Sequence, residues 1–276
     1  MKIDAHQHFW YFDPVRDAWI TDDMSVIQRD FLPVDLSPIL TKNGFDGCVA
    51  VQADQSEEET LFLLELADQF DFVKGVVGWI DLRSRNVQTR LGQFARFKKL
   101  KGFRHIVQAE ADDQFLLGED FCRGIALLGN YRFTYDILIK PHQLNATIGF
   151  VEKFPNQVFV IDHLAKPFIK DKIMGDWKQQ MQRLGQFENV SCKISGMVTE
   201  ADWKNWNMID FRPYIDHVVD SFGTDRVMFG SDWPVCTVAG KYEDVCEVVE
   251  KNTAHLSHAE KKSLWGLNAK NFYDLY

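Results

Sequence analysis

The stretch IDAHQHFW (residues 3–10) places an acid and two histidines at alternate positions near the beginning of the sequence. Side chains along a β-strand point alternately to opposite faces. If this stretch forms a strand, Asp4, His6 and His8 share one face of it. Three consecutive polar side chains on one face do not suit a hydrophobic core, so the pattern indicates a functional site at the end of a strand.

Seven further short runs of apolar and β-branched residues follow along the chain, and most are separated by amphipathic stretches. The predicted strands are 2–7, 45–52, 72–79, 100–105, 132–138, 157–163, 189–195 and 226–232. Helical patterns are clearest at 56–70, 86–99, 144–155 and 175–187. Alternation of strands and helices predicts an α/β fold with a parallel sheet, and for 276 residues a closed (β/α)8 TIM barrel. An open doubly wound sheet is the alternative, but the GxGxxG turn that it would carry is missing.

No low-complexity linker or Pro/Gly-rich hinge divides the chain, so we expect one domain over residues 1–276. The stretch 11–33 is rich in Asp, Pro and Trp and is expected to form a long loop over the mouth of the barrel. The stretch 243–276 is expected to form helices on the outside.

Composition excludes several classes of protein. A content of 46% hydrophobic and 13% aromatic residues supports a packed core rather than disorder. The net charge of −9 and the absence of a basic run argue against a nucleic-acid or membrane partner. The five cysteines form no CxxC pair, and the first ten residues do not resemble a signal peptide. We therefore expect a cytoplasmic protein with reduced thiols and a small-molecule partner, and a homodimer stays open.

Polar or amphipathic side chains gather where the predicted strands end, which is the end that carries the reactive groups in such barrels. In strand order they are His6 and His8; Gln52; Trp79 and Asp81; Arg104 and His105; Asp136; Asp162 and His163; Lys193 and Ser195; Ser231 and Asp232. Agreement among eight strand ends is difficult to explain by structural accident. The mouth of the barrel is therefore the predicted site.

Two of these groups suit catalysis of proton transfer and carbonyl activation. The His6/His8 pair is either structural or a set of imidazole ligands for a zinc-like ion. Asp232 is either a turn or helix-capping acid or a carboxylate that takes a proton from water. The position at strand ends favours the functional interpretation of both.

The remaining cations and histidines have structural alternatives of similar weight. Arg104 and His105 are either a surface pair or a binding site for a carbonyl or carboxylate. His163 is either a core histidine or a site residue, and its place at a strand end favours the second. Lys193 lies in an apolar strand, where it needs an acidic partner or a substrate oxygen.

Five motifs together resemble the amidohydrolase superfamily, and within it the lactonase branch that includes L-fuconolactonase- and L-rhamnonolactonase-type enzymes. They are IDAHQHFW (3–10), GFRH (102–105), DHLAKP (162–167), KISGM (193–197) and FGSDWPV (229–235). The resemblance covers nearly the whole chain. It implies a (β/α)8 barrel, a metal-binding or metal-replacing role for His6 and His8, and a role as base for Asp232.

The sequence departs from the superfamily pattern at two positions. Many amidohydrolases carry a metal-bridging lysine at the end of the fourth strand, whereas here Lys101 starts that strand. The fifth strand commonly supplies a histidine, and here Asp136 occupies the place. A two-metal site is therefore not expected. One Zn²⁺ on His6 and His8 with further groups, and metal-free catalysis, both stay open.

The resemblance implies hydrolysis of a sugar lactone. Asp232 would take a proton from water and return it to the ring oxygen, with His163 and His105 assisting. A sugar needs polar partners and flat apolar surfaces. The predicted substrate-binding residues are Gln7, Trp10, Gln52, Trp79, Arg104, Asp136, Lys166, Lys193 and Trp233.

Two rival functions follow from the same residues. The first is a metal-dependent decarboxylase or amide hydrolase, in which Arg104 would bind the substrate carboxylate. The second is a barrel that binds a sugar acid without converting it. The presence of Asp232, His6 and His8 argues against a pure binding protein. The identity of the lactone does not follow from the sequence.

Overall fold

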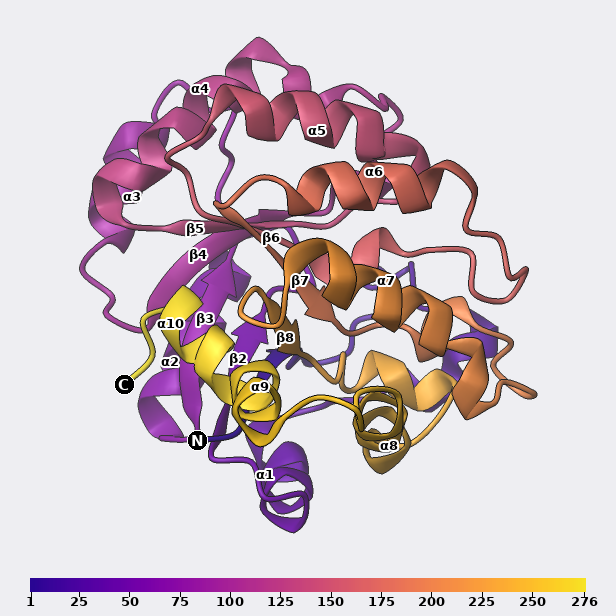
Figure 1. The fold of residues 1–276 in the computed structure, drawn as a ribbon. Helices are drawn as coiled ribbons and strands as arrows, with labels where there is room; N and C mark the ends of the chain where they lie inside the picture. Colours follow the sequence, from indigo (N-terminus) through magenta and orange to yellow (C-terminus); the bar gives the residue numbers. More distant parts are fainter.

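The computed structural model describes all of residues 1–276 and contains one eight-stranded parallel sheet in the order β1 to β8. The strands are β1 (Ile3–Gln7), β2 (Gly47–Val51), β3 (Val73–Gly78), β4 (Leu100–His105), β5 (Thr134–Ile137), β6 (Phe159–Ile161), β7 (Val190–Ile194) and β8 (Val227–Phe229). Each strand pairs with the next along the chain, and helices surround the sheet (Figure 1). The predicted (β/α)8 barrel is confirmed.

Ten helices accompany the strands (Figure 1). They are α1 (Pro33–Lys42), α2 (Glu57–Gln69), α3 (Val87–Phe94), α4 (Glu119–Leu128), α5 (Leu144–Lys153), α6 (Gly175–Gly185), α7 (Arg212–Phe222), α8 (Tyr242–Asn252), α9 (His258–Lys262) and α10 (Asn268–Phe272). The four helices predicted from periodicity correspond to α2, α3, α5 and α6. None of the ten is both long and apolar enough to traverse a lipid bilayer.

Local sequence explains where helices begin and end. At α2, the Ser56 side chain accepts a hydrogen bond from the Glu59 backbone N–H, and acids fill the first turn of the helix. α3 ends at Phe94 rather than at the predicted residue 99. The backbone turns at Phe97, whose N–H donates to Phe94, because the chain must reverse before β4 begins at Leu100.

A β-bulge in β1 changes which side chains face the barrel mouth. The register pairs Asp4 with Cys48 and Gln7 with Ala50, so β1 contains one more residue than β2 over the same span. A bulge breaks the alternation of side chains between the two faces. The prediction that Asp4 shares a face with the histidines is therefore wrong.

Asp4 instead holds the segment after β8. Its carboxylate accepts hydrogen bonds from the Ser231 backbone N–H at 2.9 Å and from the Ser231 hydroxyl at 2.6 Å. The hydroxyl of Tyr242, on α8, donates to the same carboxylate at 3.0 Å. Asp4 is a structural acid that fixes the chain next to Asp232.

The sheet closes through the residues that follow β8. The Asp232 backbone N–H donates to the His6 carbonyl at 2.8 Å, and the His8 N–H donates to the Trp233 carbonyl at 2.7 Å. Gly230 permits this approach, since a Cβ there would lie 2.6 Å from the His6 Cβ. Barrel closure thus places Asp232 beside the two histidines of β1.

The opposite end of the barrel is covered by the C-terminal segment. A small apolar cluster joins residues of the strands, such as Ala5 and Val160, to Ala269, Tyr273 and Leu275. Figure 1 shows α10 (yellow) lying across the strands in this view. That the chain forms a single domain, with a loop over the barrel mouth and C-terminal helices on the outside, remains a prediction.

Candidate active site

A cavity of about 270 Å³ lies at the C-terminal ends of the strands. It is lined by His8, Trp19, Ala53, Gln55, Arg104, Ile106, Gln108, Ala109, Leu138, His163, Lys166, Asp232 and Val235. These residues come from most of the strand-to-helix connections of the barrel. The lining combines apolar side chains with a few convergent polar groups, as is usual for small-molecule sites.

Three side-chain atoms converge at the edge of this cavity, which His8 and Asp232 line and His6 does not. The Nε2 atoms of His6 and His8 lie 3.2 Å apart. The Oδ1 atom of Asp232 lies 3.4 Å from Nε2 of His8 and 3.9 Å from Nε2 of His6. All three residues are buried. The structure therefore brings together the two predicted metal-binding histidines and the predicted base.

The chemistry of these three atoms fits a divalent cation. Nδ1 of His8 lies 2.7 Å from the Val51 carbonyl, so the Nδ1–H tautomer donates there and directs the lone pair of Nε2 toward Asp232. Two such acceptors facing each other need a positive charge or a proton between them. Ligand atoms around tetrahedral zinc are about 3.3 Å apart. The His6–His8 and His8–Asp232 separations agree with this value, whereas the His6–Asp232 separation of 3.9 Å is longer.

Below these atoms lies a buried network of charges. Nη1 of Arg104 donates to Asp162 at 3.1 Å and lies 3.3 Å from Nε2 of His6. The Lys193 ammonium lies 3.0 Å from Asp162, 3.1 Å from Nδ1 of His6 and 2.5 Å from Asp136. Two cations and two carboxylates balance one another, so the network can be buried without net charge.

The residues that follow β6 adopt a rare backbone conformation. Residues 163–166 (His163 to Lys166) all have positive φ angles, between 52° and 57°. Left-handed geometry costs roughly 1–2 kcal/mol for each residue that is not glycine, and such strain is concentrated at functional sites. This left-handed turn brings both His163 and Lys166 to the cavity.

His163 is held by groups on the neighbouring strand. Its Nδ1 lies 2.8 Å from the Ser195 hydroxyl, and its Nε2 lies 3.8 Å from Oδ1 of Asp232. Gly196 has φ +61°, and a Cβ there would lie 2.5 Å from Nδ1 of His163. The KISGM motif therefore provides both the hydrogen-bond partner of the ring and the space for it.

Burial and neighbouring charges set the protonation of the site. Burial lowers the pKa of His163 and that of His6 well below the usual value, so both rings are neutral at neutral pH. Burial alone would raise the pKa of Asp232, but His163 and His8 outweigh it and the pKa lies below its ordinary value. Asp232 is therefore an ionised carboxylate beside neutral imidazoles.

The structure does not place every predicted catalytic residue at the cavity. Nε2 of His105 lies 2.6 Å from Glu110, and its Nδ1 accepts from the Trp79 indole at 3.2 Å. The His105 ring stacks on Phe115. Both ring nitrogens thus have partners within the protein, and neither His105 nor Trp79 lines this cavity, so their predicted roles stay predictions.

Among the predicted substrate-binding residues, only Arg104 and Lys166 line the cavity. The others do not line it: Gln7, Trp10, Gln52, Asp136, Lys193 and Trp233, which are buried, and Trp79, which is half-buried. Gln7 donates to Cys48, whereas Trp10 donates to the Arg29 carbonyl. A position at a strand end therefore does not determine which way a side chain faces.

Several lining residues were missed because they lie in connections rather than strands. Trp19 and Gln55 follow β1 and β2, and Gln108 follows β4. Oε1 of Gln108 and Nε of Arg104 are buried and have no hydrogen-bond partner in the protein. An unpaired donor and an unpaired acceptor in side chains of one cavity indicate a polar ligand. The composition of 11–33 predicted a loop over the mouth, which contains Trp19, but it did not single out Trp19, and no pattern pointed to Gln55 or Gln108.

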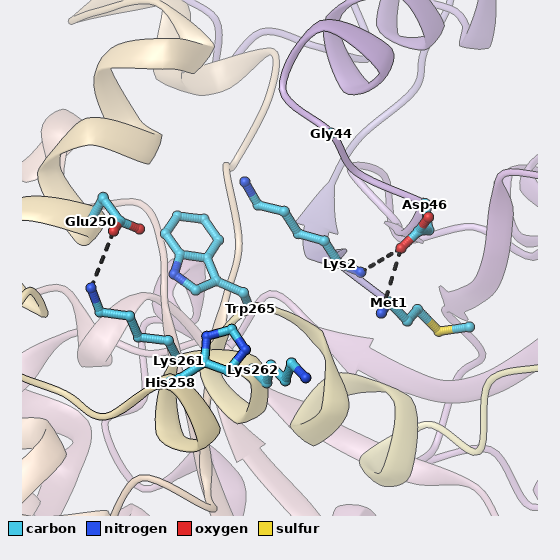
Figure 2. A pocket seen from close by; sticks show the side chains of 9 residues that line it. All are labelled: Met1, Lys2, Gly44, Asp46, Glu250, His258, Lys261, Lys262 and Trp265. Carbon is cyan, nitrogen blue, oxygen red and sulfur yellow. Dashed lines mark hydrogen bonds and ion pairs between the residues drawn. The ribbon is translucent and has the colours of Figure 1, made fainter.

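A separate cavity of about 410 Å³ lies near the beginnings of β1 and β2 (Figure 2). Several of its charged groups pair locally: the amino group of Met1 and the Lys2 backbone N–H approach Asp46, while Lys261 lies 3.3 Å from Glu250. None of the predicted site residues lines it. The convergent chemistry is at the barrel mouth.

Known proteins resemble this chain over its full length. A family model described as Amidohydrolase matches residues 3–275. L-fucono-1,5-lactonase of Burkholderia multivorans is 38% identical over 286 aligned positions, which cover 100% of this chain and 96% of that protein. A crystal structure of an amidohydrolase from Burkholderia multivorans with bound zinc has a TM-score of 0.97 at 38% identity and covers 100% of both chains. The L-rhamnono-gamma-lactonase of Scheffersomyces stipitis is 23% identical over 206 positions, covering 66% of this chain and 61% of that protein.

Proposed function

The chain belongs to the amidohydrolase family, and on that premise we propose that it hydrolyses the ester ring of a sugar lactone of the L-fucono-1,5-lactone type. One observation carries the proposal: the ionised Asp232 lies beside three imidazole rings at a cavity with unpaired polar groups. The name of the full-length relative at 38% identity supports the substrate class.

Hydrolysis of a lactone needs a base for water and positive character at the carbonyl oxygen. Asp232 is the only carboxylate that lines the cavity, and its pKa lies below the ordinary value, so it is ionised and can accept a proton. We assign it the removal of a proton from the attacking water and the return of that proton to the ring oxygen that leaves.

The oxyanion that forms on the carbonyl needs hydrogen-bond donors or a cation. The unpaired Nε–H of Arg104 is such a donor, and Lys166 adds a positive charge at the same cavity. His6 and His8, with the Asp232 carboxylate, would hold a divalent ion, which would supply further polarisation of the carbonyl. The guanidinium of Arg104 contacts His6 on the same side as this candidate metal position.

Recognition of the sugar falls to groups on the connecting loops. The unpaired Oε1 of Gln108 would accept a hydrogen bond from a substrate hydroxyl. The Oε1 of Gln55 accepts from the Ile106 N–H at 2.7 Å, which leaves its amide N–H groups for a ligand. Trp19 is 44% exposed and offers a flat apolar surface at the same cavity.

The direct test is acid release from a panel of aldonolactones, including L-fucono-1,5-lactone and L-rhamnono-γ-lactone, with spontaneous hydrolysis subtracted. We expect saturable turnover of at least one of them. Metal content is measured on the same sample, before and after chelation. If no lactone is opened faster than its spontaneous rate, the proposal is overturned, and release of CO₂ from aromatic carboxylic acids would support the decarboxylase rival.

A further inference from the structure

One partner of the buried network comes from the C-terminal segment, beyond the last strand. Tyr273 follows α10 and is 1% exposed, although it belongs to the segment that covers the bottom of the barrel. Its hydroxyl donates to Oδ2 of Asp136 at 2.7 Å. Burial raises the pKa of Tyr273 well above its ordinary value, so the hydroxyl keeps the proton that it donates.

The Asp136 carboxylate has few other partners. Its Oδ2 also accepts from Lys193 at 2.5 Å, while its Oδ1 is buried with no hydrogen-bond partner. The Tyr273 hydroxyl is therefore one of only two donors to this carboxylate. A buried carboxylate that loses a donor gains a desolvation penalty and moves toward its remaining cation.

Lys193 connects this pair to His6, one of the two candidate metal-binding histidines. Its ammonium lies 3.1 Å from Nδ1 of His6 and 3.0 Å from Asp162, and it lies over the Tyr273 ring at 5.4 Å from the centroid. The other nitrogen of the His6 ring lies 3.2 Å from Nε2 of His8. A chain of direct contacts thus runs from Tyr273 through Asp136 and Lys193 to the ring of His6.

We propose that Tyr273 is a positioning residue for the active site: from below the barrel, its hydroxyl fixes the Asp136–Lys193 pair and thereby the ring of His6. Tyr273 does not touch the substrate cavity. It acts through two other residues, as outer groups do when they orient the groups that meet a ligand. The effect on turnover rests on the proposed function, whereas the effect on His6 does not.

The test compares Tyr273→Phe with Leu275→Ala. Tyr273→Phe keeps the ring and removes only the hydroxyl, so the variant is expected to fold. Leu275 is 2% exposed and belongs to the same apolar cluster, but it has no side-chain hydrogen bond to offer. Truncating Leu275 should cost more stability than removing one hydroxyl. Leu275→Ala therefore serves as the control for a general loss of packing between the C-terminal segment and the bottom of the barrel.

We expect Tyr273→Phe to lower kcat about tenfold while KM changes less than about twofold. NMR resonances of the His6 ring, assigned by their loss in His6→Asn, should shift in Tyr273→Phe and stay in place in Leu275→Ala. Leu275→Ala should lower the melting temperature more than Tyr273→Phe does but retain kcat.

Two results would overturn the inference: unchanged His6 resonances in Tyr273→Phe, or an equal loss of kcat in Leu275→Ala. The NMR measurement needs no substrate. If the wild-type protein opens no lactone but the His6 resonances still move in Tyr273→Phe, the proposed function fails and the positioning role stands.

Discussion

The backbone N–H of Asp232 donates a hydrogen bond to the carbonyl of His6 at 2.8 Å, so the bond that helps to close the barrel also joins the proposed base to a candidate metal ligand. In a closed barrel the last strand must meet the first. Here they meet through the FGSDWPV segment, immediately beside the two histidines. The backbone hydrogen bonds that close the sheet therefore also hold Asp232 next to His6.

Replacing Asp232 by Asn should lower kcat by about 10²–10⁴-fold, because the amide cannot take a proton from water. The Asp232 backbone N–H bond to His6 does not involve the side chain, so the fold should be retained. Lactone turnover and thermal unfolding are measured on the same preparation. Turnover near that of the wild-type protein would contradict the role of Asp232 as base.

Substituting Gly196 by Ala should displace His163, since the new Cβ would lie 2.5 Å from Nδ1 of that ring. Gly44→Ala is the matched control, because Gly44 also has a positive φ angle but nothing lies within 4 Å of its Cβ position. Both variants should lose roughly 1–2 kcal/mol of stability from left-handed strain. Only Gly196→Ala should lose turnover, by about tenfold or more. Equal turnover in the two variants would remove His163 from the mechanism.

Gln108→Leu should raise KM by about three- to tenfold, which corresponds to the loss of one neutral hydrogen bond to a substrate hydroxyl. The expected change in kcat is smaller. Gln114→Leu is the control, because Gln114 is exposed and does not line the cavity. KM and kcat of both variants are measured by steady-state kinetics on the preferred lactone. An unchanged KM in Gln108→Leu would show that the unpaired oxygen of Gln108 contacts no substrate group.

Zinc binding provides a test that is independent of turnover. The metal-depleted protein should bind one zinc ion per chain in calorimetry, and His8→Ala should weaken the affinity about tenfold or more by removing one imidazole ligand. His142→Ala is the control, since His142 is exposed and pairs with Asp113. Undiminished zinc affinity in His8→Ala would place the ion elsewhere.

Glu59 should make the stability of the protein depend on pH. Its carboxylate accepts from the backbone N–H groups of Ala53 and Asp54, and burial raises its pKa from 4.5 to about 7. A carboxyl whose pKa is raised on folding stabilises the folded state most below pH 4.5, and this contribution is lost as the pH rises to about 7.

Relative to the wild-type protein, Glu59→Gln should therefore gain up to about 3 kcal/mol in the free energy of unfolding between pH 4.5 and pH 7.5. Denaturant titrations of both proteins at several pH values measure this difference. A difference that is constant with pH would show that Glu59 titrates alike in the folded and unfolded chains.

The barrel and part of its site were predictable because they depend on local patterns. Runs of apolar residues and the intervening amphipathic stretches located all eight strands, and the strand ends pointed to His8, His163 and Asp232. The prediction succeeded where the chain was regular. It failed at Asp4, because one extra residue in β1 changes which side chains point to each face of the sheet. No local sequence pattern indicated that bulge.

The direction of each strand-end side chain was decided by long-range contacts. His105 and Arg104 are neighbours in sequence. Glu110 and Trp79 bind the first away from the cavity, whereas Asp162 holds the second in the cavity wall. Asp136 was expected at the mouth, whereas Tyr273 meets it from the other end of the barrel, 137 positions later in the chain.

The sequence by itself determined the type of fold, the family and the end of the barrel at which the chemistry lies, because strand and helix periodicity and motif composition are local properties. Only the tertiary structure decided which polar groups meet at the cavity and which neutralise one another below it. Burial makes an unpaired charge costly, so each buried group turns toward the partner that the folded chain places nearest, and those partners are distant in sequence.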